Sequence, residues 1–205
     1  MLELFRQGGV VMYPLLLCSV VALAVIIERI YYFLVIRDDF EEVMDKVESS
    51  LKQNRVLEAM QVARRARGPV ASVLTAAIAR QGDSRQVLED YVRKAGNEEL
   101  YKLERGLPVL DVIVSVAPLL GLLGTILGII ESFNILGAMQ GVAEPSVISI
   151  GIAKALLTTA AGLIIAIPTA IMQAYFNRKV DRYILEMNRR SIDIINLLAN
   201  NRGEA

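Results

Sequence analysis

Three long stretches without charged side chains dominate the pattern of hydrophobic and polar positions along the chain. They run from Gln7 to Ile27, from Val112 to Ile130 and from Ala155 to Asn177. A helix rises about 1.5 Å per residue, so about 20 apolar residues cross a hydrocarbon core about 30 Å thick. In lipid every backbone polar group needs a partner within the protein, which a helix provides. The pattern therefore predicts three transmembrane helices.

Two other interpretations of these stretches are weaker. Helices buried in a soluble core are also apolar, but three such stretches are too many for the core of a 205-residue chain. The first stretch could be a cleaved signal peptide. It is long, the residues before it carry only Glu3 and Arg6, and no small-residue cleavage site follows it, which favours a retained span.

The Lys and Arg residues are distributed unevenly around the predicted spans. Arg6 alone precedes the first span, fourteen lie between Arg29 and Arg105, none lies in residues 134–148, and six follow the third span. Basic residues are enriched in the loops that stay in the cytoplasm. We therefore predict an outer N-terminus, an inner middle segment, an outer hairpin loop and an inner C-terminus.

The predicted fold is that of an all-α membrane protein with three transmembrane helices and long cytoplasmic helical extensions. Its segments are the N-terminal tail with transmembrane helix 1 (1–36), a cytoplasmic helical domain (37–106), transmembrane helix 2 (107–133), a periplasmic loop (134–148), transmembrane helix 3 (149–177) and a cytoplasmic C-terminal helix (178–205).

The middle segment is helical by its apolar spacing. Asp38 and Asp39 are candidate caps for a first helix, and the Gly68-Pro69 pair interrupts the chain before a small-residue helix over 69–81. Ser84 is a candidate cap for a last helix. We expect that helix to reach Leu103 and to be able to continue into the second span.

The composition excludes several classes of function. Lys and Arg together number 22, Asp and Glu together also number 22, and mean hydropathy is +0.46. A nucleic-acid-binding protein would need a basic excess. The chain has no His and one Cys, which excludes a catalytic imidazole, a His-ligated metal and an internal disulfide. We expect no catalytic residues, no metal, no cofactor and no enzyme activity.

Small residues recur at helical spacing in the second and third spans. They let another helix approach closely, and they favour an obligate multi-helix assembly. The predicted helix-packing residues are Ala117, Gly121, Gly124, Gly128, Gly151 and Gly162.

Threonine hydroxyls lie inside the same two spans. If the hairpin turns near Gly141, Thr125 lies sixteen residues before the turn and Thr159 eighteen after it, so the two should lie at similar depth. Thr158 precedes Thr159, and all three threonines are candidate ion-path residues. A threonine in a membrane helix commonly donates to its own backbone, so packing is the alternative to a role in ion passage.

Lys154 is the charged exception inside the third span. A lysine within a membrane helix costs roughly 2.5–3.5 kcal/mol on insertion scales and is a functional candidate. Two structural alternatives are snorkelling toward the outer surface and an ion pair with Glu131, which lies at a comparable depth on span two. Both residues are therefore candidate ion-path residues.

Two motif blocks of the hairpin resemble the ExbB/TolQ/MotA family of ion-driven motor subunits, in its three-span ExbB/TolQ-like branch. The blocks are APLLGLLGTILG over Ala117–Gly128, followed by Phe133, and GIAKALLTTAAGLIIAIP over Gly151–Pro168. The Glu28-Arg29 pair after the first span also fits the family.

The resemblance implies a ring of five copies in the bacterial inner membrane, whose spans two and three line a pore. Two single-span ExbD/TolR-like helices would sit in this pore, each with an aspartate that takes and releases a proton. The ring would pass mechanical work to a TonB- or TolA-like protein for outer-membrane transport or envelope maintenance. By position, Thr125 and Thr159 match the threonines that face the partner's aspartate.

The chain departs from the family pattern at one position. ExbB and TolQ usually carry a glutamate where this sequence has Lys154. Glu131 could supply the missing carboxylate, or burial could lower the pKa of the lysine enough to leave a neutral amine that relays a proton. The alternatives to the motor interpretation are a non-conducting scaffold and a sodium-driven or motility-motor subunit of the same fold.

Overall fold

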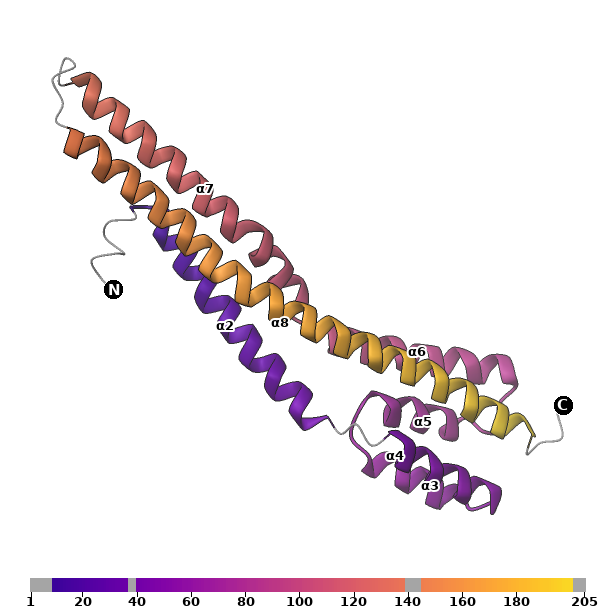
Figure 1. Ribbon diagram of the computed structural model, residues 1–205. Coiled ribbons are helices and arrows are strands. Elements are labelled where there is room, and N and C mark those ends of the chain that lie inside the picture. Colours follow the sequence, from indigo (N-terminus) through magenta and orange to yellow (C-terminus); the bar gives the residue numbers. More distant parts are fainter. Residues whose placement is uncertain (1–8, 37–39, 139–144, 201–205) are drawn as a thin grey trace. The chain divides into compact units, whose positions relative to one another are not determined.

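Helices form most of the chain (Figure 1). The computed structural model describes residues 9–36, 40–138 and 145–200. Its helices are α2 (Met12–Val35), α3 (Phe40–Lys52), α4 (Val56–Arg65), α5 (Pro69–Ala79), α6 (Arg85–Glu104), α7 (Leu107–Ala138) and α8 (Pro145–Asn200). Three helical stretches, which include α2, α7 and the first part of α8, are long and apolar enough to cross a membrane. Among the described residues, the prediction of an all-helical chain is confirmed, and three helices have the length and composition that the predicted spans require.

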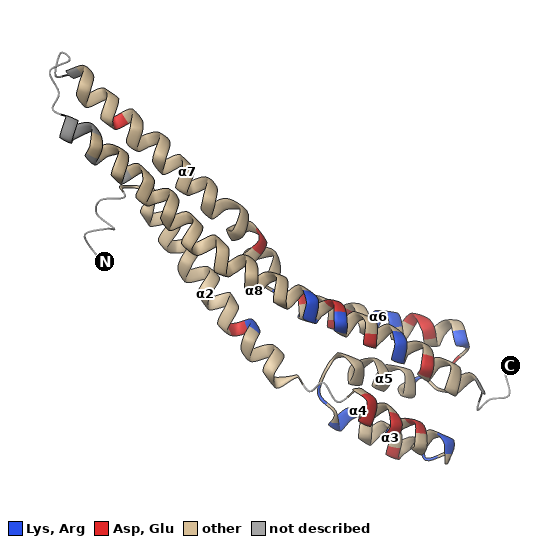
Figure 2. Ribbon diagram, in the orientation of Figure 1, with Lys and Arg blue, Asp and Glu red and all other residues tan. Residues whose placement is uncertain are grey.

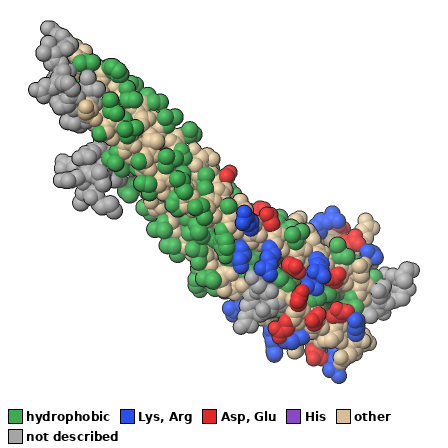
Figure 3. Space-filling view, in the orientation of Figure 1, with side chains coloured by type: hydrophobic (Ala, Val, Ile, Leu, Met, Phe, Trp, Pro, Cys, Tyr) green, Lys and Arg blue, Asp and Glu red, His purple; other side chains and the backbone are tan. Residues whose placement is uncertain are grey.

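The chain divides into two compact units. The apolar unit comprises Met1–Arg29 and Gly106–Tyr175, and the polar unit comprises Ile30–Arg105 and Phe176–Ala205. Charged residues gather on the helices of the polar unit (Figure 2), whereas hydrophobic side chains cover those of the apolar unit (Figure 3). Charged and apolar residues are thus concentrated in different units.

In the apolar unit, α7 and the first part of α8 run antiparallel, side by side (Figure 1). Small side chains line their contact, while large ones such as Leu119, Leu156 and Ile164 point outward. Val25 of α2 approaches Gly106, so α2 passes beside the start of α7. A surface this apolar is suited to lipid or to other membrane helices.

In the polar unit, successive short helices pack against one another, with α4 against α3 and α5, and α5 against α6. Their core includes Val47, Val73, Leu74 and Leu103, all fully buried. The nearly buried Glu99 carboxylate accepts a hydrogen bond from Lys102 at 2.7 Å, which raises the pKa of Lys102 above its ordinary value.

Aromatic rings join the end of α2 to the last part of α8 within the polar unit. Phe33 stacks on Phe176 with ring centroids 5.8 Å apart, and Tyr183 lies 6.1 Å from Phe33 and 5.4 Å from Phe40. Offset-stacked and edge-to-face pairs stabilise beyond the area that they bury. The cluster therefore anchors α8 to the chain segment that leaves the first span.

The structure corrects two helix boundaries. The last inner helix does not continue into the second span, because Gly106 adopts a positive φ of 79° and separates α6 from α7. Helix also extends into the 134–148 segment, since α7 continues to Ala138 and α8 begins at Pro145.

The break at Gly68-Pro69 and the helix that follows it are confirmed. Ser84 is the N-cap residue of α6, but its side chain makes no capping hydrogen bond. Asp38 and Asp39 lie outside the described residues.

Candidate functional site

The contact between α7 and α8 is so close that side chains larger than hydrogen do not fit at several of its glycines. A methyl group on Gly162 would lie 2.6 Å from the carbonyl oxygen of Ala117, and one on Gly121 would lie 2.9 Å from that of Thr158. A methyl group on Gly124 would collide with the Thr158 side chain, and one on Gly151 with Ser132. Backbones therefore meet directly along the hairpin, as small residues in membrane helices allow.

The register of the hairpin follows from these contacts. Ala117 lies against Gly162, Gly121 against Thr158 and Thr159, and Gly128 against Ala155. Thr125 is four residues beyond Gly121, about one helical turn or 6 Å along α7. Thr125 and Thr159 therefore lie within about one turn of each other.

Thr158 is buried inside the helix contact. Its hydroxyl donates to its own helix at the Ala155 carbonyl oxygen, 2.7 Å away, and lies 3.2 Å from the Gly121 carbonyl oxygen. Only 1% of the residue is exposed. Both the geometry and the burial give this hydroxyl a packing role between α7 and α8.

Thr159 is positioned differently from its neighbour. Its hydroxyl crosses to α7 and donates to the same Gly121 carbonyl oxygen at 3.1 Å, while the residue stays partly exposed. Thr125 is also partly exposed and donates to the Leu122 carbonyl oxygen of its own helix. Because each hydroxyl donates its single proton, its oxygen keeps lone pairs that can accept a hydrogen bond from outside the hairpin.

The two charged candidates lie nearer the turn. Glu131 is exposed on α7. Lys154 belongs to α8, but its side chain lies outside the described part of the structure, so the expected ion pair between them stays a prediction. The backbone register is compatible with it, because Gly128 lies against Ala155 and Ser132 against Gly151.

The structure adds two polar positions that the sequence analysis did not select. Ser132 is buried and donates to the Gly128 carbonyl oxygen at 2.8 Å. It continues the series of small residues on α7, a spacing from which it could have been found. At the other end of the hairpin, Gln173 of α8 donates to the Asp111 carboxylate at 2.9 Å. The sequence could have indicated this pair, because Asp111 and Gln173 lie at nearly equal distances from the predicted turn.

Comparison with known proteins gives a family match. A model described as the MotA/TolQ/ExbB proton channel family matches residues 65–189. The chain is 32% identical over 181 residues to a putative biopolymer transport protein ExbB homolog of Methanothermobacter thermautotrophicus, covering 88% of this chain and 64% of that protein. It is 36% identical over 172 residues to a putative ExbB-like protein of Synechocystis, covering 82% of this chain and 66% of that protein. It is 30% identical over 203 residues to the biopolymer transport protein exbB1 of Vibrio cholerae, covering 95% and 86%. The chain thus spans slightly less than two thirds of the length of the first two relatives.

Proposed function

Because this chain belongs to the MotA/TolQ/ExbB proton channel family, we propose that it is a ring subunit of a motor driven by the proton-motive force. The ring has five copies, encloses two ExbD/TolR-like helices and drives a TonB- or TolA-like protein. The chain resides in a bacterial inner membrane with its N-terminus in the periplasm and its C-terminus in the cytoplasm. The uneven distribution of Lys and Arg supports this orientation, and the mass of the intact assembly tests the number of copies.

The observation that carries the proposal is the pair of partly exposed hydroxyls, Thr125 and Thr159, which lie among exposed apolar side chains of α7 and α8. We infer from the family that the titrating group is an aspartate of the partner, while Glu131 and Lys154 stay candidate ion-path residues of this chain. When protonated, this carboxyl donates a hydrogen bond to a threonine oxygen. When ionised, it accepts a hydrogen bond from a threonine hydroxyl that has rotated away from the Gly121 or Leu122 carbonyl oxygen.

Proton uptake by vesicles tests the proposal directly. The chain and its ExbD/TolR-like partner are reconstituted together or singly, an inward proton gradient is applied, and a trapped pH-sensitive dye is followed. We expect uptake only when both proteins are present, because neither supplies the whole path. A sodium gradient applied at equal pH distinguishes the sodium-driven alternative. Uptake no faster than in empty vesicles with both proteins present would exclude a conducting role.

Lys154 favours a second candidate, a non-conducting scaffold of the same fold. An ammonium ion in the path repels cations, whereas a carboxylate attracts them. If the assembly conducts, Lys154→Glu should retain or increase partner-dependent uptake, and Lys154→Gln should separate the loss of positive charge from the gain of a carboxylate. Absence of uptake in the wild type and in both variants, with correctly assembled protein, would favour the scaffold.

A further inference from the structure

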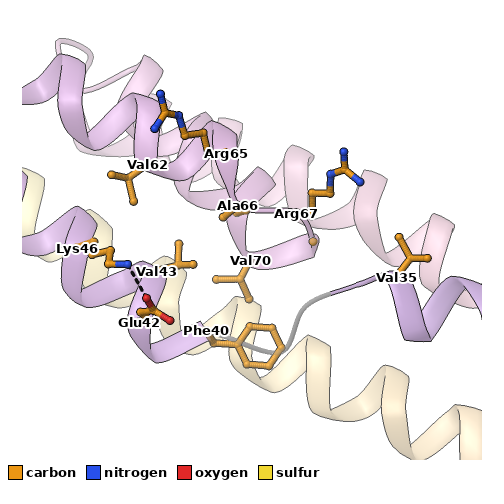
Figure 4. A pocket seen from close by; sticks show the side chains of 12 residues that line it. Val35, Phe40, Glu42, Val43, Lys46, Val62, Arg65, Ala66, Arg67 and Val70 are labelled. Carbon is orange, nitrogen blue, oxygen red and sulfur yellow. Dashed lines mark hydrogen bonds and ion pairs between the residues drawn. The ribbon is translucent and has the colours of Figure 1, made fainter.

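A cavity of about 530 Å³ lies within the polar unit, between the end of α2 and helices α3, α4 and α5 (Figure 4). Its volume falls within the range of roughly 300–1,000 Å³ that is typical of small-molecule sites. All of its lining residues belong to the polar unit. The cavity is separate from the threonine pair of the hairpin and has no part in the function proposed above.

The floor of the cavity is apolar. Phe40 and Val70 are buried there, and Val43 and Val62 are half-buried beside them. Figure 4 shows the three valine side chains directed toward one another across the space. Such a floor suits a hydrocarbon chain better than a strongly hydrated ligand, because apolar surface is stabilised when it is removed from water.

The rim carries positive charge. Arg65 ends α4, and Arg67 follows it in the connection to α5. Both side chains are exposed, and neither guanidinium has an ion pair or hydrogen bond with any residue that the structure describes. The third basic side chain of the rim, Lys46, is already paired with Glu42 (Figure 4). The arginines are therefore the groups available to an anion.

The cavity opens where the first span ends. Val35, the last residue of α2, belongs to its lining. With 24 residues, α2 exceeds the roughly 20 needed to cross the hydrocarbon core. Its last turns still expose apolar side chains, with Tyr31 71% and Leu34 78% exposed. If α2 crosses the membrane, this end lies near the lipid headgroups of one leaflet.

We propose that the cavity binds an anionic phospholipid from the adjacent leaflet. Arg65 and Arg67 hold the headgroup phosphate, and Val43, Val62 and Val70 contact an acyl chain that enters beside Val35. Arginine suits this role because its planar guanidinium presents several N–H donors to phosphate oxygens. Charge at the rim, an apolar floor and the end of a span together select a lipid over a soluble phosphate compound.

The test uses the intact purified assembly, stripped of lipid in detergent and titrated with phosphatidylglycerol or with phosphatidylcholine of the same acyl chains. Bound lipid is counted by native mass spectrometry. The variants are Arg65→Gln, Arg67→Gln and the pair together. Arg64→Gln is the matched control, since Arg64 is exposed in the same basic run but does not line the cavity.

We expect phosphatidylglycerol to bind and phosphatidylcholine to bind more weakly. Each cavity arginine should contribute about fivefold in apparent affinity and the pair about 25-fold, while Arg64→Gln binds like the wild type. The pair Arg65→Lys and Arg67→Lys keeps the charge but loses the guanidinium donors, so it should bind more strongly than the double glutamine variant and more weakly than the wild type. Circular dichroism and assembly mass establish that each variant is folded.

Three results would overturn the proposal. An equal loss of phosphatidylglycerol binding in Arg64→Gln and Arg65→Gln would show a general effect of surface charge. Unchanged binding in the double glutamine variant would place the lipid elsewhere. Displacement of phosphatidylglycerol by millimolar inorganic phosphate alone would identify a phosphate site without an acyl-chain contact. Each of these outcomes leaves the proton-uptake measurement, and thus the proposed motor function, unaffected.

Discussion

Thr159→Val is expected to lower partner-dependent proton uptake by roughly 10- to 100-fold while leaving the assembly intact. Valine matches threonine in size, so the helix contact keeps its shape. The substitution removes the hydroxyl that donates to the Gly121 carbonyl oxygen at 3.1 Å and that presents its own oxygen to a partner. Loss of that single hydrogen bond costs about 0.5–1.5 kcal/mol of stability, too little to unfold the hairpin.

A large functional effect is expected because, under the proposed function, the two threonine hydroxyls are the hydrogen-bonding groups offered to the partner. The side chains around the threonine pair are apolar, with Leu122, Ile126 and Ala160 exposed nearby. Without the hydroxyl, a carboxylate from the partner would lose hydration without gaining a hydrogen bond, which is costly in a membrane. Thr125→Val should act in the same direction because its hydroxyl lies within about one turn.

Thr169→Val is the matched control for this prediction. Thr169 lies on the same helix, is buried, and donates to the Ile165 carbonyl oxygen of its own helix at 2.7 Å. The Thr169→Val variant should retain proton uptake within about twofold of the wild type, since the Thr169 hydroxyl donates to the backbone of its own helix. The vesicle assay with the pH-sensitive dye measures all three variants. If Thr125→Val and Thr159→Val both conduct like the wild type, the threonine pair is not the ion path.

Gly124→Ala is expected to destabilise the protein by about 1–3 kcal/mol, because the added methyl group collides with the Thr158 side chain. Thr158 cannot move aside, since it is 99% buried and its hydroxyl is held by the Ala155 carbonyl. The two helices must therefore separate. Thermal unfolding of the purified assembly, followed by the helical circular-dichroism signal, measures the loss.

Gly137→Ala on the same helix provides the control. A methyl group at Gly137 has no neighbour within 4 Å, so alanine should be neutral or should stabilise by up to about 1 kcal/mol through helix propensity. Thr158→Gly combined with Gly124→Ala should recover part of the lost stability, because it removes the colliding atoms. Equal stability of Gly124→Ala and Gly137→Ala would contradict the close contact between α7 and α8.

The sequence by itself determined the helical class, the three helices able to span a membrane and the approximate antiparallel register of α7 and α8. Membrane spans are readable because lipid leaves a chain few alternatives to an apolar helix. Small residues at regular spacing indicated that α7 and α8 present glycines to a neighbouring helix. Counting residues in both directions from Gly141 predicted that Thr125 and Thr159 lie at similar depth. In the structure they lie within about one helical turn of each other.

Only the tertiary structure decided which of these residues face inward. Thr158 and Thr159 are adjacent in sequence, yet one is sealed between helices and the other is partly exposed, because helix rotation differs by about 100° between neighbours. Likewise, the sequence allowed an unbroken helix across Pro108, whereas the positive φ of Gly106 ends it. The arginine-rimmed cavity depends on how α2, α3, α4 and α5 pack together. Periodicity determines which residues share a helix face, but the direction of that face depends on side-chain packing between segments distant in sequence.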